Sequence, residues 1–371
     1  MSVTRRAILR TFAPATHLSV SVNSLLPAAL CLNSVKLSST SSTALCITPV
    51  RSMASTAVSN QQSNPEPVAA AQPWRCHFES DETTPRVYAF FEKATSTWQY
   101  IVADSKTSEA VIIDSVLDYD PASGVVSTTT ADGSLGFIRQ NNLHVTRILE
   151  THAHADHLTA AQYLKQQLGG IVPVCIGSRI TQVQQTFAPV YGYDSPQFFD
   201  HTFDVYLKDD EIIKLGDFQG QVIHLPGHTP DHVGYVFGKA IFTGDSIFNP
   251  DVGSARVDFP GGNARALYAS MQRLLSYPPH FRLFAGHDYP SGRDQNCSAT
   301  VAEQREKNIH CKVGIPSDAF IDWRKVRDAQ LGAPRLLHPS LQVNIRAGKL
   351  PPADEKGRVL LKTPVKTNIK L

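Results

Sequence analysis

Three histidines and one aspartate fall within six residues, in the stretch that runs from His152 to His157 (HAHADH). Imidazole and carboxylate groups are common protein ligands of zinc and iron, and short histidine-rich tracts usually bind metal. On an extended segment alternate side chains project to the same side, so His152 and His154 can hold one ion together. Asp156 and His157 then point elsewhere, towards a second ion. We therefore expect a metal site rather than a solvated polar turn.

Three further motifs each place a metal-binding residue type directly after an expected strand. They are Pro-Gly-His-Thr-Pro with His228, Thr-Gly-Asp with Asp245 and Gly-His-Asp-Tyr with His287. Small residues beside each side chain let the backbone turn sharply and aim that side chain into a shared cleft. His232 lies four residues after His228, and we expect it to support the site or to lie on the surface rather than to bind metal.

The elements that must position these motifs are short strands interrupted by helices. Strands are expected at 87–91, 100–102, 110–113, 146–149, 172–176, 204–207, 221–225, 234–237, 240–243 and 283–285, and helices at 155–167, 178–187, 263–276 and 299–308. Residues 115–137 are expected to form a polar loop that leads into a short helix at 137–141. This order favours an α+β fold in which helices pack outside two sheets.

Composition excludes several classes of protein. The 371 residues are 42% hydrophobic and 18% charged, which allows a sizeable buried core. The net charge of +2 and the lack of a long apolar run predict neither a nucleic-acid nor a membrane partner. The six cysteines form no CxxC pair, so we expect free thiols rather than a zinc finger or a disulfide framework.

The first 65 residues differ from the rest in charge, because they hold five basic residues and no acidic one. An acid-free start with Arg5, Arg6 and Arg10 is typical of a transit peptide and favours the mitochondrial matrix. A disordered tail without a targeting role is the alternative, and initiation at Met53 would give a cytosolic form. The expected division is a leader at 1–65, a linker at 66–73 and one domain at 74–371, which includes a C-terminal helix and tail at 298–371.

The four motifs, in this order, resemble those of the metallo-β-lactamase superfamily over about residues 87–287. The resemblance implies an αββα sandwich with the metal cleft between the upper sheet edges. Residues 253–259 (GSARVDF) are similar to the G-x-x-R-x-D-F stretch of persulfide dioxygenases and their bacterial β-lactamase-like relatives. Glyoxalase II enzymes usually carry a lysine and a tyrosine where Arg256 and Asp258 stand.

The dioxygenase resemblance implies oxidation of glutathione persulfide by O2 to sulfite and glutathione, with one Fe(II) per chain. The implied iron ligands are His152, His228 and Asp245, and the residues that orient them are His154, Asp156, His157 and His287. The alternative is a glyoxalase II-like hydrolase of a glutathione thioester, with two zinc ions. One ion would then bind His152, His154 and His228, the other Asp156, His157 and His287, with Asp245 bridging. A non-enzymatic member of the fold is disfavoured by the complete ligand set.

Two more residues are candidates for binding the substrate. The guanidinium of Arg256 suits a carboxylate of a glutathione-like thiol, and an ion pair with Asp258 is the alternative. The hydroxyl of Tyr289, two residues after His287, either reaches the cleft or belongs to a packed aromatic ring. The long 115–137 segment bears on access to the cleft. The sequence does not decide the oligomeric state, for which a homodimer is one option.

Overall fold

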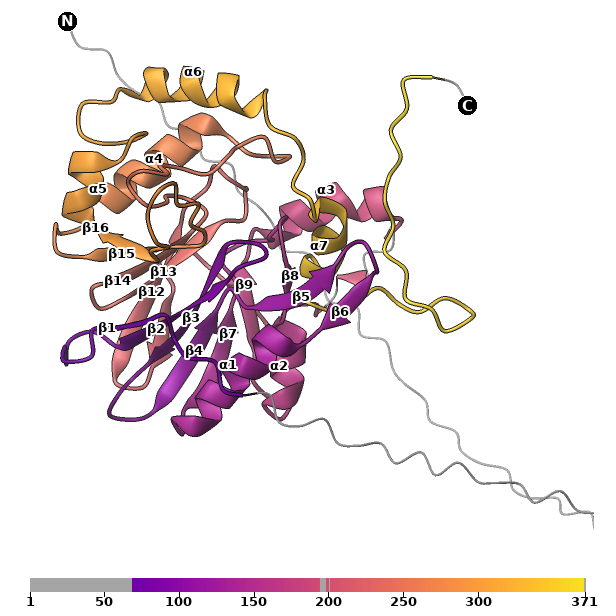
Figure 1. The fold of residues 1–371 in the computed structure, drawn as a ribbon, viewed down its shortest axis with the longest axis horizontal. Helices are drawn as coiled ribbons and strands as arrows, with labels where there is room; N and C mark the ends of the chain where they lie inside the picture. The colour runs from indigo at the N-terminus through magenta and orange to yellow at the C-terminus, as the bar shows by residue number, and fades with distance from the viewer. Residues whose placement is uncertain (1–68, 194–197, 200, 370–371) are drawn as a thin grey trace, which may run out of the picture. The chain divides into compact units, whose positions relative to one another are not determined.

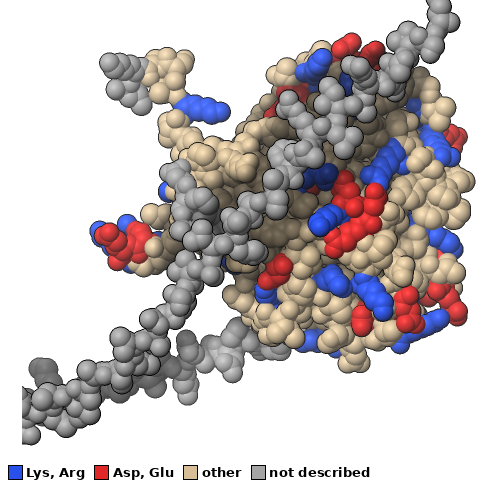
Figure 2. All heavy atoms as spheres, turned by 180° about the vertical axis from the view of Figure 1, so that it is seen from behind, with Lys and Arg blue, Asp and Glu red and all other residues tan. Residues whose placement is uncertain are grey.

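The structure is a computed structural model that describes residues 69–193, 198–199 and 201–369, which belong to one compact unit. The expected leader at 1–65 and the alternative start at Met53 lie outside the described residues. Within the described part of the chain, no helix is both long and apolar enough to cross a membrane. On the face drawn in Figure 2, basic and acidic side chains are interspersed, and neither sign dominates.

The first of two large sheets has seven strands in the order β1-β2-β3-β4-β7-β9-β10 (Figure 1). Strands β1 to β4 pair antiparallel, whereas β4, β7, β9 and β10 run parallel. The bounds are β1 Arg75–His77, β2 Arg86–Glu92, β3 Thr97–Ala103, β4 Glu109–Ile113, β7 His144–Leu149, β9 Val174–Gly177 and β10 Val205–Leu207.

The second sheet has six strands in the order β11-β12-β13-β14-β15-β16, antiparallel except for the parallel pair β14 and β15. Its bounds are β11 Ile212–Leu215, β12 Phe218–His224, β13 Val233–Phe237, β14 Ala240–Gly244, β15 Arg282–Ala285 and β16 Ser298–Thr300. Because β12 and β14 both run opposite to β13, the strands β12, β14 and β15 all end at the same edge.

Side chains that alternate along the central strands are buried on both faces of the first sheet. Trp98 and Tyr100 of β3 pack between the two sheets with Tyr235 and Phe242, whereas Ile101 faces the outer helices. Helices cover both outer faces, so the layers follow the expected αββα order (Figure 1). The helices are α1 Thr129–Gln140, α2 Ala161–Gln167, α3 Ile180–Tyr191, α4 Ala264–Leu275, α5 Val301–Lys307, α6 Ser317–Asp328 and α7 Leu337–Asn344.

The prediction of a polar loop at 115–137 is wrong. This segment forms β5 (Val116–Asp120), β6 (Val125–Ser127) and most of α1. The helix α1 could not be predicted from the sequence because it contains two glycines, Gly133 and Gly136, and glycine is a poor helix former. The entering chain explains one of them, since a Cβ at Gly136 would lie 2.7 Å from the Cα of Ala70. Ala71 also donates a hydrogen bond to the carbonyl of Gly133, so residues assigned to a linker pack on this helix.

The helix expected at 155–167 begins six residues later, at Ala161. Residues 158–159 form the short strand β8 (Leu158–Thr159), which pairs with Val116 and Leu117 of β5. This pairing uses backbone N–H and C=O groups of residues 158–159 that a helix would need for its own hydrogen bonds. The C-terminal part holds two helices, α6 and α7, beyond the one predicted at 299–308, and both bear on the site described next.

Candidate metal centre

All seven residues proposed as metal ligands gather at one edge of the sandwich. His152, His154, Asp156 and His157 follow β7, whereas His228, Asp245 and His287 follow β12, β14 and β15. The backbone N–H of Gly286 donates to the carbonyl of Gly244 at 2.9 Å, which holds the last two turns side by side. Six of the seven side chains are buried, and Asp156 is partly exposed.

The protein fixes the ring tautomer of His152. The hydroxyl of Thr151 donates to Asp114 at 2.8 Å, so it can only accept from Nδ1–H of His152, 3.0 Å away. Burial lowers the pKa of His152 well below its usual range, which keeps the ring neutral. Its Nε2 atom is buried and has no hydrogen-bond partner among the described residues. The ring therefore presents an unshared lone pair to the cleft.

The same logic holds for three more histidines in their neutral form. Nδ1–H of His228 donates to the carbonyl of Arg256 at 2.8 Å, and Nδ1–H of His287 donates to the carbonyl of Ser96 at 3.1 Å. Nε2–H of His154 faces Asp114 at 3.1 Å, which leaves Nδ1 of His154 buried without a partner in the described chain. In each neutral ring the nitrogen that remains is an acceptor.

Buried polar atoms without partners are rare in folded proteins and need an explanation. Four of them occur in this cluster, among the residues that the structure describes: Nε2 of His152, Nδ1 of His154, Nε2 of His157 and Oδ1 of Asp245. One ligand atom from each of His152, His228 and Asp245 lies within 4.8 Å of the other two. The donor types and these unused lone pairs fit a bound metal ion.

The carboxylate of Asp245 lies between two groups of candidate ligands. Its Oδ2 is 3.6 Å from Nε2 of His228, and its Oδ1 is 3.5 Å from Nε2 of His287. Asp156 is on the second side, 3.2 Å from Nε2 of His287 and 3.1 Å from Nδ1 of His157. Asp156 and His157 also form a compact donor group with His154. Asp245 therefore lies within reach of histidines from both groups of candidate ligands.

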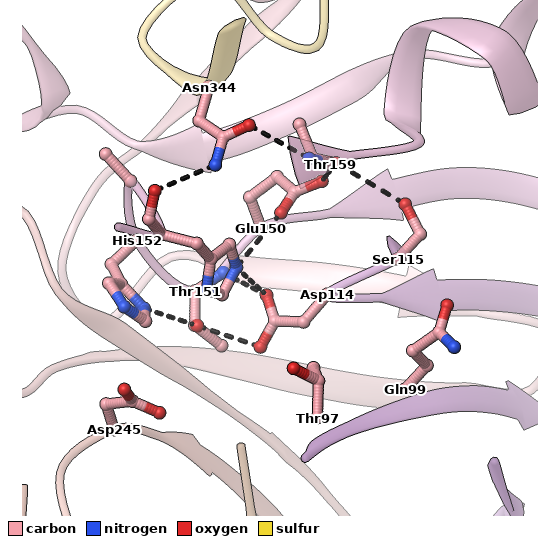
Figure 3. Close-up of polar contacts among 12 residues, drawn as sticks. Thr97, Gln99, Asp114, Ser115, Glu150, Thr151, His152, Thr159, Asp245 and Asn344 are labelled. Carbon is pink, nitrogen blue, oxygen red and sulfur yellow. Dashed lines mark hydrogen bonds and ion pairs between the residues drawn. The ribbon is translucent and has the colours of Figure 1, made fainter. Parts of the chain in front are cut away.

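Sequence reasoning missed two buried carboxylates that hold His154. Asp114 and Glu150 lie 3.1 and 3.3 Å from its Nε2 atom, at the ends of β4 and β7 (Figure 3). Burial alone would lower the pKa of His154, but Asp114 and Glu150 raise it well above its usual range. A metal ion that binds Nδ1 of His154 would therefore have to displace a proton. An acidic residue at each strand end was a signal in the sequence, although its spacing matched no ligand motif.

A third missed residue is Asn344, in the last turn of α7. Its side-chain amide donates to the carbonyls of His154 and His157, at 2.8 and 2.7 Å. Its oxygen accepts from the backbone N–H of Thr159 at 2.9 Å (Figure 3). These three bonds join the C-terminal helix to the loop that carries four candidate ligands.

His232 is buried, so it is a supporting residue rather than a surface one. Its Nε2 accepts the backbone N–H of Asp245 at 2.9 Å, and its ring stacks on His152 with centroids 4.7 Å apart. The preceding Asp231 accepts the N–H of Ala153 at 3.0 Å. His232 therefore stabilises the turn that carries Asp245, and Asp231 stabilises the loop that carries His152 and His154.

A cavity of about 580 Å³ opens above the ligands, a volume that suits a small molecule. Arg256 lines it but forms a two-pronged ion pair with Asp258, with both distances 2.5 Å, as the alternative interpretation expected. Tyr289 also lines it: its ring stacks on His287 at 5.8 Å between centroids and remains 52% exposed. Its phenolic hydroxyl is protonated at neutral pH and can donate a hydrogen bond.

The chain is similar in sequence and fold to several known proteins. The profile of the metallo-beta-lactamase superfamily matches residues 94–287. The chain is 44% identical over 283 residues to a beta-lactamase hydrolase-like protein of Xylella fastidiosa (76% of this chain, 65% of that protein). It is 43% identical over 286 residues to glyoxylase B2 of Dictyostelium discoideum (76% and 97%). The human mitochondrial persulfide dioxygenase ETHE1 is 26% identical over 261 residues (70% and 87%).

Among solved structures, ETHE1 from Myxococcus xanthus superimposes with a TM-score of 0.57 at 27% identity, covering 71% of this chain and 99% of that one. The chain spans about 65% of the length of the Xylella relative, so the activity of that whole protein is not transferred to it. Together with the two-sheet fold and the seven gathered residues, the profile match identifies the chain as a member of the metallo-β-lactamase superfamily.

Proposed function

We propose that the protein is a metal-dependent hydrolase that binds two divalent ions and cleaves a thioester of a small thiol. The observation that carries this proposal is the position of Asp245, whose two carboxylate oxygens face different histidines, His228 and His287. A carboxylate placed in this way is suited to bridge two ions. Paired ions in hydrolases would supply an activated water and polarise the carbonyl group that it attacks.

When bound, such ions lower the pKa of a water molecule and polarise a carbonyl oxygen. The chain's own residues supply the geometry. Asp114 and Glu150 hold the ring of His154, and Thr151 and Asp114 hold the tautomer of His152. Such outer contacts usually orient metal ligands and raise their basicity. Tyr289, protonated and at the cavity wall, is placed to donate a hydrogen bond to a bound substrate.

The names of similar proteins support hydrolysis. Glyoxylase B2 and the beta-lactamase hydrolase-like protein match at 43% and 44% identity, whereas the named persulfide dioxygenase matches at 26%. The sequence expectation of a dioxygenase therefore becomes the second candidate. It is favoured by one observation, the superposition on the ETHE1 structure from Myxococcus xanthus over 99% of that chain. In that case one iron would use His152, His228 and Asp245.

Metal content and two parallel assays separate the candidates. The full chain is purified after growth with both zinc and iron, and bound metal is measured by mass spectrometry. We expect two ions per chain and hydrolysis of S-lactoylglutathione that stops on chelation. One iron per chain, with oxygen uptake on glutathione persulfide and no thioester cleavage, would replace the hydrolase with the dioxygenase.

Import into the mitochondrial matrix is a further part of the proposal. The acid-free sequence of residues 1–65 supports it. Fluorescent fusions of the full chain and of a form that starts at Met53 test it: the first should enter mitochondria and the second should remain cytosolic.

A further inference from the structure

Among the described residues that line the main cavity, the balance of charge is uneven. The only carboxylates in this lining are those of Asp156 and Asp245, both at candidate ligand positions on the floor. The same lining contains four arginines: Arg256, Arg324, Arg327 and Arg335. The wall away from the metal site is therefore basic.

Two of these arginines are already neutralised. Arg256 pairs with Asp258, and Arg324, buried in α6, pairs with Asp328 one turn further along the same helix. Arg324 also donates to the carbonyl of Ala255 at 3.2 Å, and Asp328 accepts the N–H of Val257 at 3.0 Å. This network joins α6 to residues 255–258, so the guanidinium groups of Arg256 and Arg324 stabilise the cavity wall.

Arg327 and Arg335 differ because neither forms an ion pair or a side-chain hydrogen bond with any residue that the structure describes. Both side chains are exposed, and both line the cavity. Arg335 also lines a smaller adjoining cavity of about 260 Å³, where Asp120 is a neighbour. The carboxylate of Asp120 is occupied by Ser123 and by the N–H of Ala122, at 2.6 and 3.0 Å.

Both arginines lie among apolar residues of the cavity lining. Arg327 lies one turn after Trp323 on α6, so both side chains share the helix face that borders the cavity. Leu331 and Pro334 complete this wall between the helix and Arg335. A guanidinium beside apolar surface at a cavity mouth suits a carboxylate, which it can bind with two parallel hydrogen bonds.

We propose that Arg327 and Arg335 form an anion-binding subsite that selects thioesters carrying a carboxylate remote from the scissile bond. This inference rests on the proposed hydrolase for its substrate, but the subsite itself binds the thiol portion. Arg256, the residue that the sequence suggests for such a carboxylate, already uses its Nε and Nη2 atoms in the ion pair with Asp258. Selection comes instead from α6 and the segment that follows it.

The test compares two thioesters with the same acyl group, S-lactoylglutathione and the neutral S-lactoyl-N-acetylcysteamine. In the double variant Arg327→Glu/Arg335→Glu we expect KM for the anionic substrate to rise about ten-fold with little change in kcat. KM for the neutral substrate should change less than about two-fold. The control is Lys325→Glu, an equal charge change on an exposed residue of α6 that does not line the cavity.

A binding measurement separates this inference from the proposed reaction. Glutathione and its diethyl ester are titrated into the metal-loaded full chain by calorimetry. Tighter binding of glutathione that is lost in the double variant supports the subsite even if no thioester is cleaved. Equal binding of the two compounds, or an unchanged KM in an active double variant, overturns it and leaves the hydrolase intact.

Discussion

The side-chain amide of Asn344 donates a hydrogen bond to the backbone carbonyl of His154, at 2.8 Å, across 190 residues of sequence. A second bond from the same amide reaches the carbonyl of His157 at 2.7 Å. Asn344 is buried, so water does not compete for these bonds. One side chain of the C-terminal helix thus sets the shape of the loop that carries most of the candidate ligands.

We expect Asn344→Ala to weaken metal binding by about 10- to 100-fold, as is usual when a group that orients ligands is removed. The nearly isosteric Asn344→Asp should be as harmful, because a carboxylate cannot donate to the two carbonyls. Zinc titration against a competing chelator gives the affinity.

The matched control is Gln342→Ala, on the same helix. Gln342 is also buried, and its side-chain amide also donates to two backbone carbonyls, those of His338 and Lys362, at 2.7 and 2.8 Å. Neither carbonyl belongs to the ligand-bearing loop. The loss of Gln342 should therefore lower the melting temperature without changing zinc affinity. If both variants lose zinc equally, Asn344 contributes only to general stability.

A second prediction concerns Gly227, which precedes His228 and has a φ of +143°. A Cβ at this position would lie 2.3 Å from the backbone of Leu267 in α4, so the turn needs glycine for space as well as for conformation. We expect Gly227→Ala to destabilise the fold by more than about 2 kcal/mol.

Gly124→Ala separates conformation from space. Gly124 also has a positive φ, +72°, but a Cβ there would meet nothing within 4 Å among the described residues. That variant should cost about 1 kcal/mol, the usual penalty for a left-handed alanine. Urea unfolding of both variants measures the difference, and equal losses would show that the contact with Leu267 does not matter.

The parts of the site that could be predicted from sequence are those encoded locally. The ligand types in 152–157 and the glycine beside each later ligand are short-range patterns, and each follows a strand with a clear apolar run. The contacts of Asn344 and the pairing of β8 with β5 could not be predicted in this way. They join segments far apart in the chain, and tertiary pairing at Thr159 overrides the local preference for an earlier helix start.

Asp245→Asn tests the shared carboxylate. The amide keeps the shape but offers one neutral oxygen, so it cannot bridge two ions. We expect the metal content to fall from two ions to one or fewer, and kcat to fall more than about 100-fold. Asp318→Asn, on an exposed residue of α6, is the control. Two ions and full activity in Asp245→Asn would refute the proposed site.

The last prediction concerns acid stability and His77, which packs edge-on against Phe284 and lies 3.3 Å from Sγ of Cys297. Burial, with help from Arg282 and Arg75, lowers the pKa of His77 from 6.5 to about 4. Between these two values the unfolded chain binds the proton and the folded chain does not, so stability falls as the pH drops from 6.5 to 4.

Replacing the ring removes this contribution. We expect His77→Gln to lose about 1 to 3 kcal/mol less than the unmodified protein when the pH is lowered from 7 to 4.5, whatever its stability at pH 7. His280→Gln, at an exposed position, should follow the unmodified protein. Urea unfolding at a series of pH values gives the three curves. If the free energy of unfolding depends on pH in the same way in His77→Gln and His280→Gln, protonation of His77 does not oppose folding. The folded protein would then accommodate the charged ring beside Cys297.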